Sequence, residues 1–199
     1  MSPSDLRFLP HFTDKPALGV LELDSIARGI QTIDAVMKKA PITMMMSRPV
    51  SGGKHIIMFR GGVAEVNECM AAGKDRSGDS LVDHLELHYT HTQIWSFLPE
   101  PVVSEDWGDG SEDSVGIIEI ATVCSAILSA DQAVKEAEVT LRDMRLALGI
   151  SGKAFFTFTG ELNQVDAAAD AAQKAADKHF LHREIIPAPA DTLRGRLFF

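Results

Sequence analysis

The stretch Gly19-Val20-Leu21-Glu22-Leu23 returns 97 residues later as Gly116-Ile117-Ile118-Glu119-Ile120. The same offset continues through a series of identical pairs, which are Asp34 with Asp131, Lys38 with Lys135, Ala40 with Ala137, Thr43 with Thr140 and Arg48 with Arg145. The second copy then gains two residues, and an offset of 99 matches Gly53-Lys54 with Gly152-Lys153, Gly61 with Gly160 and Val66 with Val165. Because glycines, charges and apolar residues recur in one order, the two halves should share one backbone fold.

Each copy opens on a short apolar run, residues 18–23 and 115–120, that predicts a buried strand. A helix should follow, because apolar residues then recur at spacings of four, three and four. These residues are Ile26, Ile30, Ile33 and Met37 in the first copy, and Val123, Ile127, Ala130 and Val134 in the second. We expect this apolar face to pack on the sheet.

The rest of each copy predicts a hairpin, a second helix and a last strand. The hairpin strands are expected at 42–50 and 54–60, and at 139–148 and 153–159. The second helix should begin after Gly61 or Gly160, with its apolar face formed by Val63, Val66 and Met70, or by Leu162, Val165, Ala168 and Ala172. A last strand is expected near 84–88 and 183–186. The fold class is therefore α/β, an α+β sandwich of two tandem domains, each β-α-β-β-α-β in a ferredoxin-like layout.

Composition divides the chain and excludes some classes of partner. We expect an N-terminal arm at 1–16, a first domain at 17–98, an acidic linker at 99–114, and a second domain with a C-terminal tail at 115–199. The net charge of -9 argues against nucleic acid and anionic membranes as partners. Only two cysteines occur, Cys69 and Cys124, which favours a reducing compartment and no disulfide framework. Both cysteines are expected to pack as small apolar side chains.

Two further segments carry a family resemblance. Ala17-Leu18-Gly19-Val20-Leu21-Glu22 resembles the first strand of the bacterial microcompartment (BMC) shell domain, and residues 33–40 resemble its helix that ends in an edge lysine. The resemblance covers about 17–190, and the order of elements is similar to the non-permuted tandem class (BMC-T) that forms trimers. It implies a structural shell protein rather than an enzyme, located in the microcompartment shell within the cytoplasm. Its partners would be two further copies in a trimer that can stack on a second trimer, and other shell proteins.

The resemblance also implies a pore and a tile edge. Three chains would form a pseudohexamer whose central pore passes small metabolites, lined by Ser51, Gly52, Gly53, Lys54, Ile150, Ser151, Gly152 and Lys153. The lysines would attract anions near the axis, or be ordinary hydrated rim lysines. Lys38 and Lys135 would lie at the tile edge, or be solvated lysines. Some tandem members carry an iron-sulfur cluster on a pore-loop cysteine, and neither loop here has one, so we expect no cofactor or metal.

Other chemical readings are weaker. His84, His88 and His91 have metal-like spacing on a helix, but the segment favours a strand, where His91 leaves the shared face. Glu22 and Glu119 recur at one strand position, which suits a structural hydrogen-bonding carboxylate better than a catalytic pair. Neither glycine-lysine pair completes a phosphate-binding loop. Two alternative functions stay open, a trimer that is gated by a bound metabolite and a small enzyme that uses the histidine run.

Overall fold

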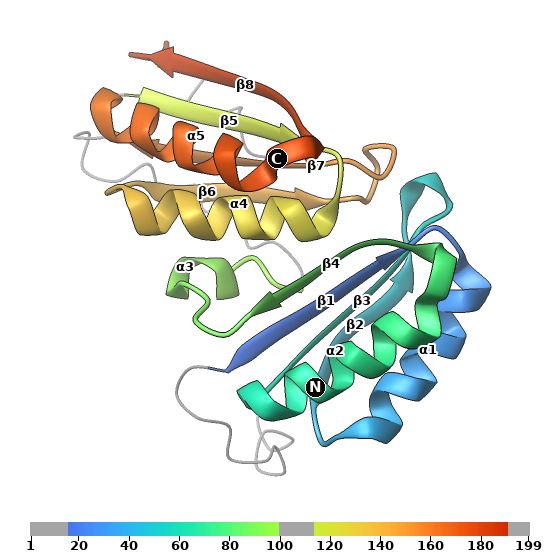
Figure 1. Cartoon of the computed structure of the whole chain (residues 1–199). Helices are drawn as coiled ribbons and strands as arrows, with labels where there is room; N and C mark the ends of the chain where they lie inside the picture. The colour runs from blue at the N-terminus through green and yellow to red at the C-terminus, as the bar shows by residue number, and fades with distance from the viewer. Residues whose placement is uncertain (1–15, 100–113, 191–199) are drawn as a thin grey trace, which may run out of the picture. The chain divides into compact units, whose positions relative to one another are not determined.

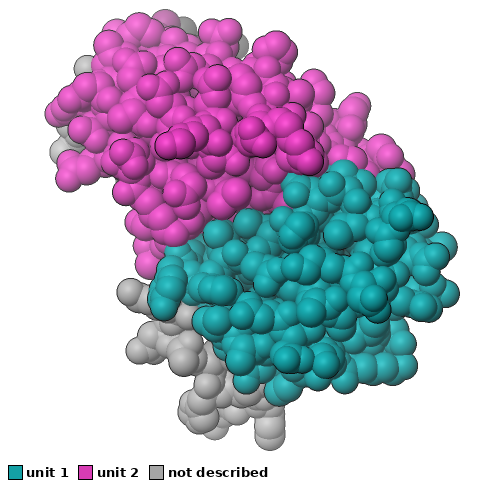
Figure 2. Space-filling view, viewed as in Figure 1, with its two compact units in different colours: residues 1–48, 55–90 teal, residues 49–54, 91–199 magenta. Residues whose placement is uncertain are grey.

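The structure is a computed structural model that describes residues 16–99 and 114–190. Its contacts divide the chain into two compact units (Figure 2). Unit 1 contains residues up to 48 and 55–90, and unit 2 contains 49–54 and residues from 91 onward. The described residues leave out most of the N-terminal arm, the acidic linker and the C-terminal tail that the sequence predicts. Residues 91–98, placed in the first domain by the sequence analysis, pack with unit 2 instead.

Each unit has the expected order of elements around a four-stranded antiparallel sheet (Figure 1). The elements of the first copy are β1 (Ala17–Leu23), α1 (Ile26–Lys39), β2 (Thr43–Pro49), β3 (His55–Gly61), α2 (Val63–Ser77) and β4 (Leu81–Leu87). A short helix, α3 (Thr92–Trp95), follows it. The second copy has β5 (Ser114–Ile120), α4 (Val123–Glu136), β6 (Thr140–Leu146), β7 (Ala154–Gly160), α5 (Leu162–Ala176) and β8 (Phe180–Pro187). The strand orders, β2-β3-β1-β4 and β6-β7-β5-β8, confirm the ferredoxin-like layout.

The repeat extends to strand register and helix caps. Leu18 lies opposite Leu87 in unit 1, and the equivalent Val115 lies opposite Ile186 in unit 2. The Ser25 hydroxyl accepts the Arg28 backbone N–H at 3.2 Å, and the equivalent Thr122 hydroxyl accepts that of Ser125 at 3.3 Å. Each cap satisfies one of the unpaired N–H groups at the start of a helix. No helix of the described residues is long and apolar enough to cross a membrane.

The centre of each sheet is a strand glycine covered by an aromatic ring. Gly19 lies opposite Phe59 in the β1–β3 register, and a Cβ added at Gly19 would lie 2.6 Å from that ring. Gly116 and Phe158 repeat the arrangement, with a corresponding distance of 2.4 Å. The two copies therefore share a packing contact that only glycine allows. Cys69 and Cys124 are both buried, which confirms their expected packing role.

The prediction of which face of the first helix packs on the sheet is wrong. Ile26, Ile30 and Met37 are exposed, Ile33 is partly buried against the core, and the fully buried residues of α1 are Gly29, Thr32 and Val36. At 3.6 residues per turn this buried stripe lies about a quarter turn from the apolar one. Small side chains face the sheet because the helix approaches it closely: a Cβ at Gly29 would lie 2.4 Å from the His55 ring. The equivalent residues of α4, which are Val123, Ile127, Ala130 and Val134, are buried.

We predict that Gly19→Ala lowers the free energy of unfolding by about 1–3 kcal/mol, because the added methyl overpacks against the Phe59 ring. Urea unfolding of the two proteins measures the difference. Adding Phe59→Leu should recover part of the loss in a double-mutant cycle. Equal stabilities of Gly19→Ala and wild type would contradict the packing argument.

Candidate functional site

The expected pore tip of the first copy is a tight turn whose shape requires glycine. Residues 51–53 form one short turn between β2 and β3, in which Gly52 has φ 79° and Gly53 has φ 75°. These angles lie in the left-handed region, which glycine adopts without a steric penalty. Both glycines are exposed. The tip therefore presents mainly backbone.

The tip of the second copy packs directly against the first, since residues 49–54 belong to unit 2. The Gly149 backbone N–H donates to the Ser51 hydroxyl at 3.0 Å. A Cβ added at Gly152 would lie 2.7 Å from the Ser51 carbonyl oxygen, and Gly152 has φ 76°. Ser151 also adopts a left-handed conformation, with φ 55°. The structure thus brings the two predicted tips together, and Gly152 is the residue that permits their approach.

The two lysines that follow the tips have different surroundings. Lys54 is half-buried, and its ammonium donates to the carbonyls of Gly152 at 3.2 Å and Ala121 at 3.3 Å. Lys153 is exposed and lies 3.8 Å from the Glu119 carboxylate. Lys54 therefore holds the second tip in place, while the charge of Lys153 is balanced by a carboxylate at the surface. Their expected attraction for anions stays a prediction.

A buried histidine behind the first tip was missed by the sequence analysis. His55 is 3% exposed, and its Nε2 lies 2.9 Å from the Ser47 hydroxyl. Burial lowers the pKa of this imidazole, because the charged form loses its hydration. The equivalent residue of the second copy is Ala154. Comparing the copies position by position would have revealed this difference.

We predict that His55 makes the stability of the protein depend on pH. Its folded-state pKa lies below the unfolded value of about 6.5. As the pH falls below that value, the unfolded chain takes up a proton before the folded chain does, so stability is lost. Urea unfolding between pH 8 and pH 5 should show a smaller loss for His55→Gln than for wild type. His84→Gln removes an exposed histidine and should follow wild type; parallel curves for all three proteins would refute the idea.

The two predicted edge lysines each pair with the aspartate four residues earlier. Lys38 and Asp34 are 2.7 Å apart, and both side chains are largely exposed. Lys135 and Asp131 are 2.5 Å apart, and Asp131 is fully buried. Asp131 also accepts the His91 backbone N–H at 2.7 Å. The duplicated pair is thus a surface ion pair in unit 1 and part of a buried network in unit 2.

The three residues of the histidine run have separate surroundings. His84 is exposed on β4, and His88 contacts the Asn67 side chain at 2.9 Å. His91 caps α3, where its Nδ1 accepts the Gln93 backbone N–H. Among residues 16–99 and 114–190, no three His, Cys, Asp or Glu side chains are grouped as metal ligands.

The repeated glutamates also have unlike surroundings. Glu22 is fully buried, whereas the Glu119 side chain is 44% exposed and pairs with Lys153. A buried carboxylate needs hydrogen-bonding partners, which agrees with the structural interpretation of Glu22.

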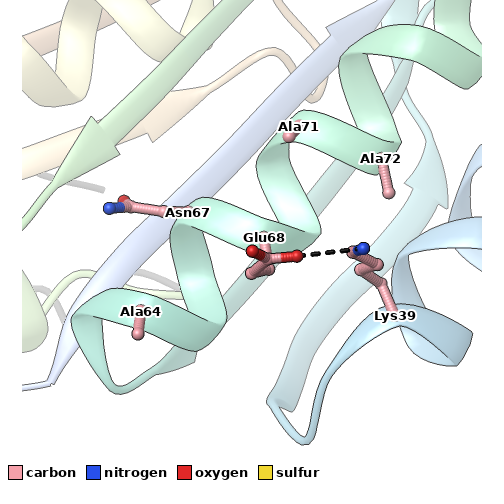
Figure 3. A pocket seen from close by; sticks show the side chains of 6 residues that line it. All are labelled: Lys39, Ala64, Asn67, Glu68, Ala71 and Ala72. Carbon is pink, nitrogen blue, oxygen red and sulfur yellow. Dashed lines mark ion pairs between the residues drawn. The ribbon is translucent and has the colours of Figure 1, made fainter.

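A shallow groove runs between α1 and α2 (Figure 3). It has a volume of about 480 Å³ and is lined by Lys39, Ala64, Asn67, Glu68, Ala71 and Ala72. The only two charged groups of this lining form an ion pair, with Lys39 and Glu68 2.9 Å apart. The groove therefore offers small side chains and paired charges, which is not an arrangement typical of catalysis.

Comparisons with known proteins agree on one family. The sequence model of the BMC domain matches the chain twice, over residues 17–89 and 114–189. The chain is 34% identical over 179 residues to the bacterial microcompartment shell protein PduT of Citrobacter freundii. This alignment covers 89% of this chain and 95% of PduT. The chain is 32% identical over 93 residues to the carboxysome shell protein CsoS1B of Halothiobacillus neapolitanus, covering 45% and 84% of the two chains. A microcompartment protein from Desulfitobacterium hafniense DCB has a crystal structure similar to this one, with a TM-score of 0.73, 32% identity, and coverage of 90% of this chain and 98% of that one.

Proposed function

The chain belongs to the BMC-domain family of bacterial microcompartment shell proteins, and we propose that three copies of it form a pseudohexameric shell tile with a central pore. It is a structural component of the microcompartment shell. The observation that carries the proposal is the duplication itself, which repeats down to strand register and helix caps. Two similar units per chain can close a six-unit ring when three chains repeat one contact by rotation.

The tips at 51–53 and 150–152 would line the pore. Their geometry supports this, because Gly52 and Gly53 expose backbone and Gly152 allows the close approach of the two tips. The ammonium of Lys54 would stiffen the pore wall, because it ties the first tip to the carbonyl of Gly152. Such a pore would select small metabolites mainly by size and by the backbone dipoles that it presents.

We propose no catalytic reaction for this protein. Its relatives are named as shell proteins. In the described part of the chain His88 and His91 have separate hydrogen-bond partners, the repeated glutamates differ in burial, and the groove between α1 and α2 holds a neutralised ion pair. None of these groups forms a nucleophile with an adjacent base.

We predict that the native mass of the purified protein corresponds to three chains, or to six if two trimers stack. Native mass spectrometry across a range of protein concentrations measures this directly. A mass of one or two chains at every concentration would rule out the tile.

Lys38 is the better position for a test of the tile edge. Its exposed ion pair contributes little to folding. Removing Lys135 would instead leave the buried Asp131 carboxylate without its cation, which is strongly destabilising. A change at Lys135 would therefore confuse loss of assembly with loss of fold.

We predict that Lys38→Asp abolishes extended sheets but preserves trimers, because two tiles would then present like charges at their shared edge. Electron microscopy measures sheet formation, and native mass spectrometry measures the trimer. Lys39→Asp alters the next residue, which pairs with Glu68 on the groove side, and serves as the matched control. Normal sheets from Lys38→Asp, or loss of its trimer, would refute the edge role.

A further inference from the structure

Equivalent helix faces of the two copies differ in exposure. Ile30 of α1 is 59% exposed and Met37 is 60% exposed, whereas their counterparts in α4, Ile127 and Val134, are 0% and 7% exposed. Ile26 is also exposed, and its counterpart Val123 is buried. Unit 1 thus carries an apolar helix face that is open to solvent. We call Ile26, Ile30 and Met37 the open α1 face.

In unit 2 the segment 91–98 packs against the helix α4, which is the equivalent of α1. Its helix α3 contacts α4 and β6, and Ile94, Phe97 and Leu98 are buried. The segment is anchored at its start, where the Asp131 carboxylate accepts the His91 backbone N–H. It follows directly on the first matched BMC domain and lies outside both matched ranges.

Gln93 adds a strand-like contact. Its side-chain amide donates to the Val139 carbonyl at 3.0 Å and accepts the Leu141 backbone N–H at 2.7 Å. One side chain therefore makes the two hydrogen bonds that a neighbouring strand would make with the edge strand β6.

The C-terminal tail is the counterpart of this segment in the second copy. Strands β4 and β8 pair with β1 and β5 in the same register, at an offset of 99. Continued past the strands, that offset places Ala190 at the position of His91, Leu193 at that of Ile94, and Leu197 at that of Leu98. The tail, residues 191–199, thus has apolar residues at two of the three buried positions of 91–98.

We propose that the tail of one chain covers the open α1 face of a neighbouring chain, with Leu193 and Leu197 as the apolar contacts. Asp34, the counterpart of Asp131, would accept the backbone N–H of Ala190. The partner is a second copy of this chain, because in a closed ring each second copy is followed by the first copy of the next chain. The contact that 91–98 makes within a chain is then repeated between chains. This inference rests on the proposed trimer.

The proposed tail contact between chains should be weaker than the contact that 91–98 makes within a chain. The counterpart of Gln93 in the tail is Thr192, whose short hydroxyl side chain cannot bridge two backbone groups as an amide does. The equivalents of Val139 and Leu141 beside the edge strand β2 are Ile42 and Met44. The proposed tail contact between chains therefore lacks the two hydrogen bonds that Gln93 adds to the contact within a chain.

Disulfide formation between two singly substituted chains tests the placement of the tail. Ile30→Cys chains are mixed with Leu193→Cys chains, reassembled and oxidised, and the products are separated on a denaturing gel without reductant. We expect a cross-linked pair that contains one chain of each kind. Val63→Cys replaces an exposed apolar residue on α2 and is the matched control for Ile30→Cys. It should give no mixed product with Leu193→Cys.

Native mass measured on the same samples separates the two possible failures. A trimer without the mixed disulfide overturns the placement of the tail and leaves the proposed tile standing. A mass of one chain overturns the tile, and the tail proposal with it. A third sample is a chain that carries both Ile30→Cys and Leu193→Cys, and a disulfide that forms within this chain but not in the mixture overturns the neighbouring chain as the partner.

A substitution that adds hydrogen bonds to the tail contact provides the second test of the tail's placement. Thr192→Gln restores the amide that the tail lacks, so we expect chains to exchange between labelled trimers more slowly, on the order of tenfold for two added hydrogen bonds. Thr92→Gln makes the same substitution at an exposed position of α3 and should exchange at the wild-type rate. An exchange rate for Thr192→Gln equal to that of wild type overturns the placement of Thr192 beside β2.

Discussion

The packing of a phenylalanine ring over a strand glycine at the centre of each sheet is the constraint on which the other features depend. Phe59 occupies the space that a side chain at Gly19 would need, and Phe158 does the same at Gly116. Because each ring lies directly opposite its glycine, the contact is tied to the register of β1 with β3 and of β5 with β7. That register determines where β3 and β7 begin, and hence where the preceding tips lie. The duplicated chain can vary its tips and helix faces because this centre is the same in both copies.

Around the shared centre, one residue pair serves two purposes. Asp34 and Lys38 form an exposed ion pair, whereas Asp131 is buried, paired with Lys135 and bonded to the backbone of the segment 91–98. A carboxylate without a cation or hydrogen-bond donors is costly to bury, so the second network is held more tightly than the first. In the proposed tile, this difference separates contacts within a chain from contacts between chains. Duplication therefore allows one half of the protein to be specialised without changing the other.

The two tips share a backbone feature but differ in the side chains around them. Left-handed glycines determine the shape of the expected pore, and a lysine stabilises that shape by donating to carbonyl groups. A buried histidine, His55, follows the first tip in the chain, whereas the second tip is followed by Ala154. The two tips of one chain are thus equivalent in backbone role but not in chemistry, which a shell built from identical single-domain subunits cannot achieve.

The sequence by itself determined the duplication, the order of elements and the position of both tips along the chain, because each depends on local spacing that repeats in register. Only the tertiary structure decided which side of α1 meets the sheet, since apolar spacing gives the orientation of a stripe but not the closeness of packing that favours Gly29 and Thr32 there. It also decided that 91–98 packs with the second unit, and that Lys54 is bonded to Gly152 and Ala121. These contacts join residues far apart in the chain, and no local pattern records such a pairing.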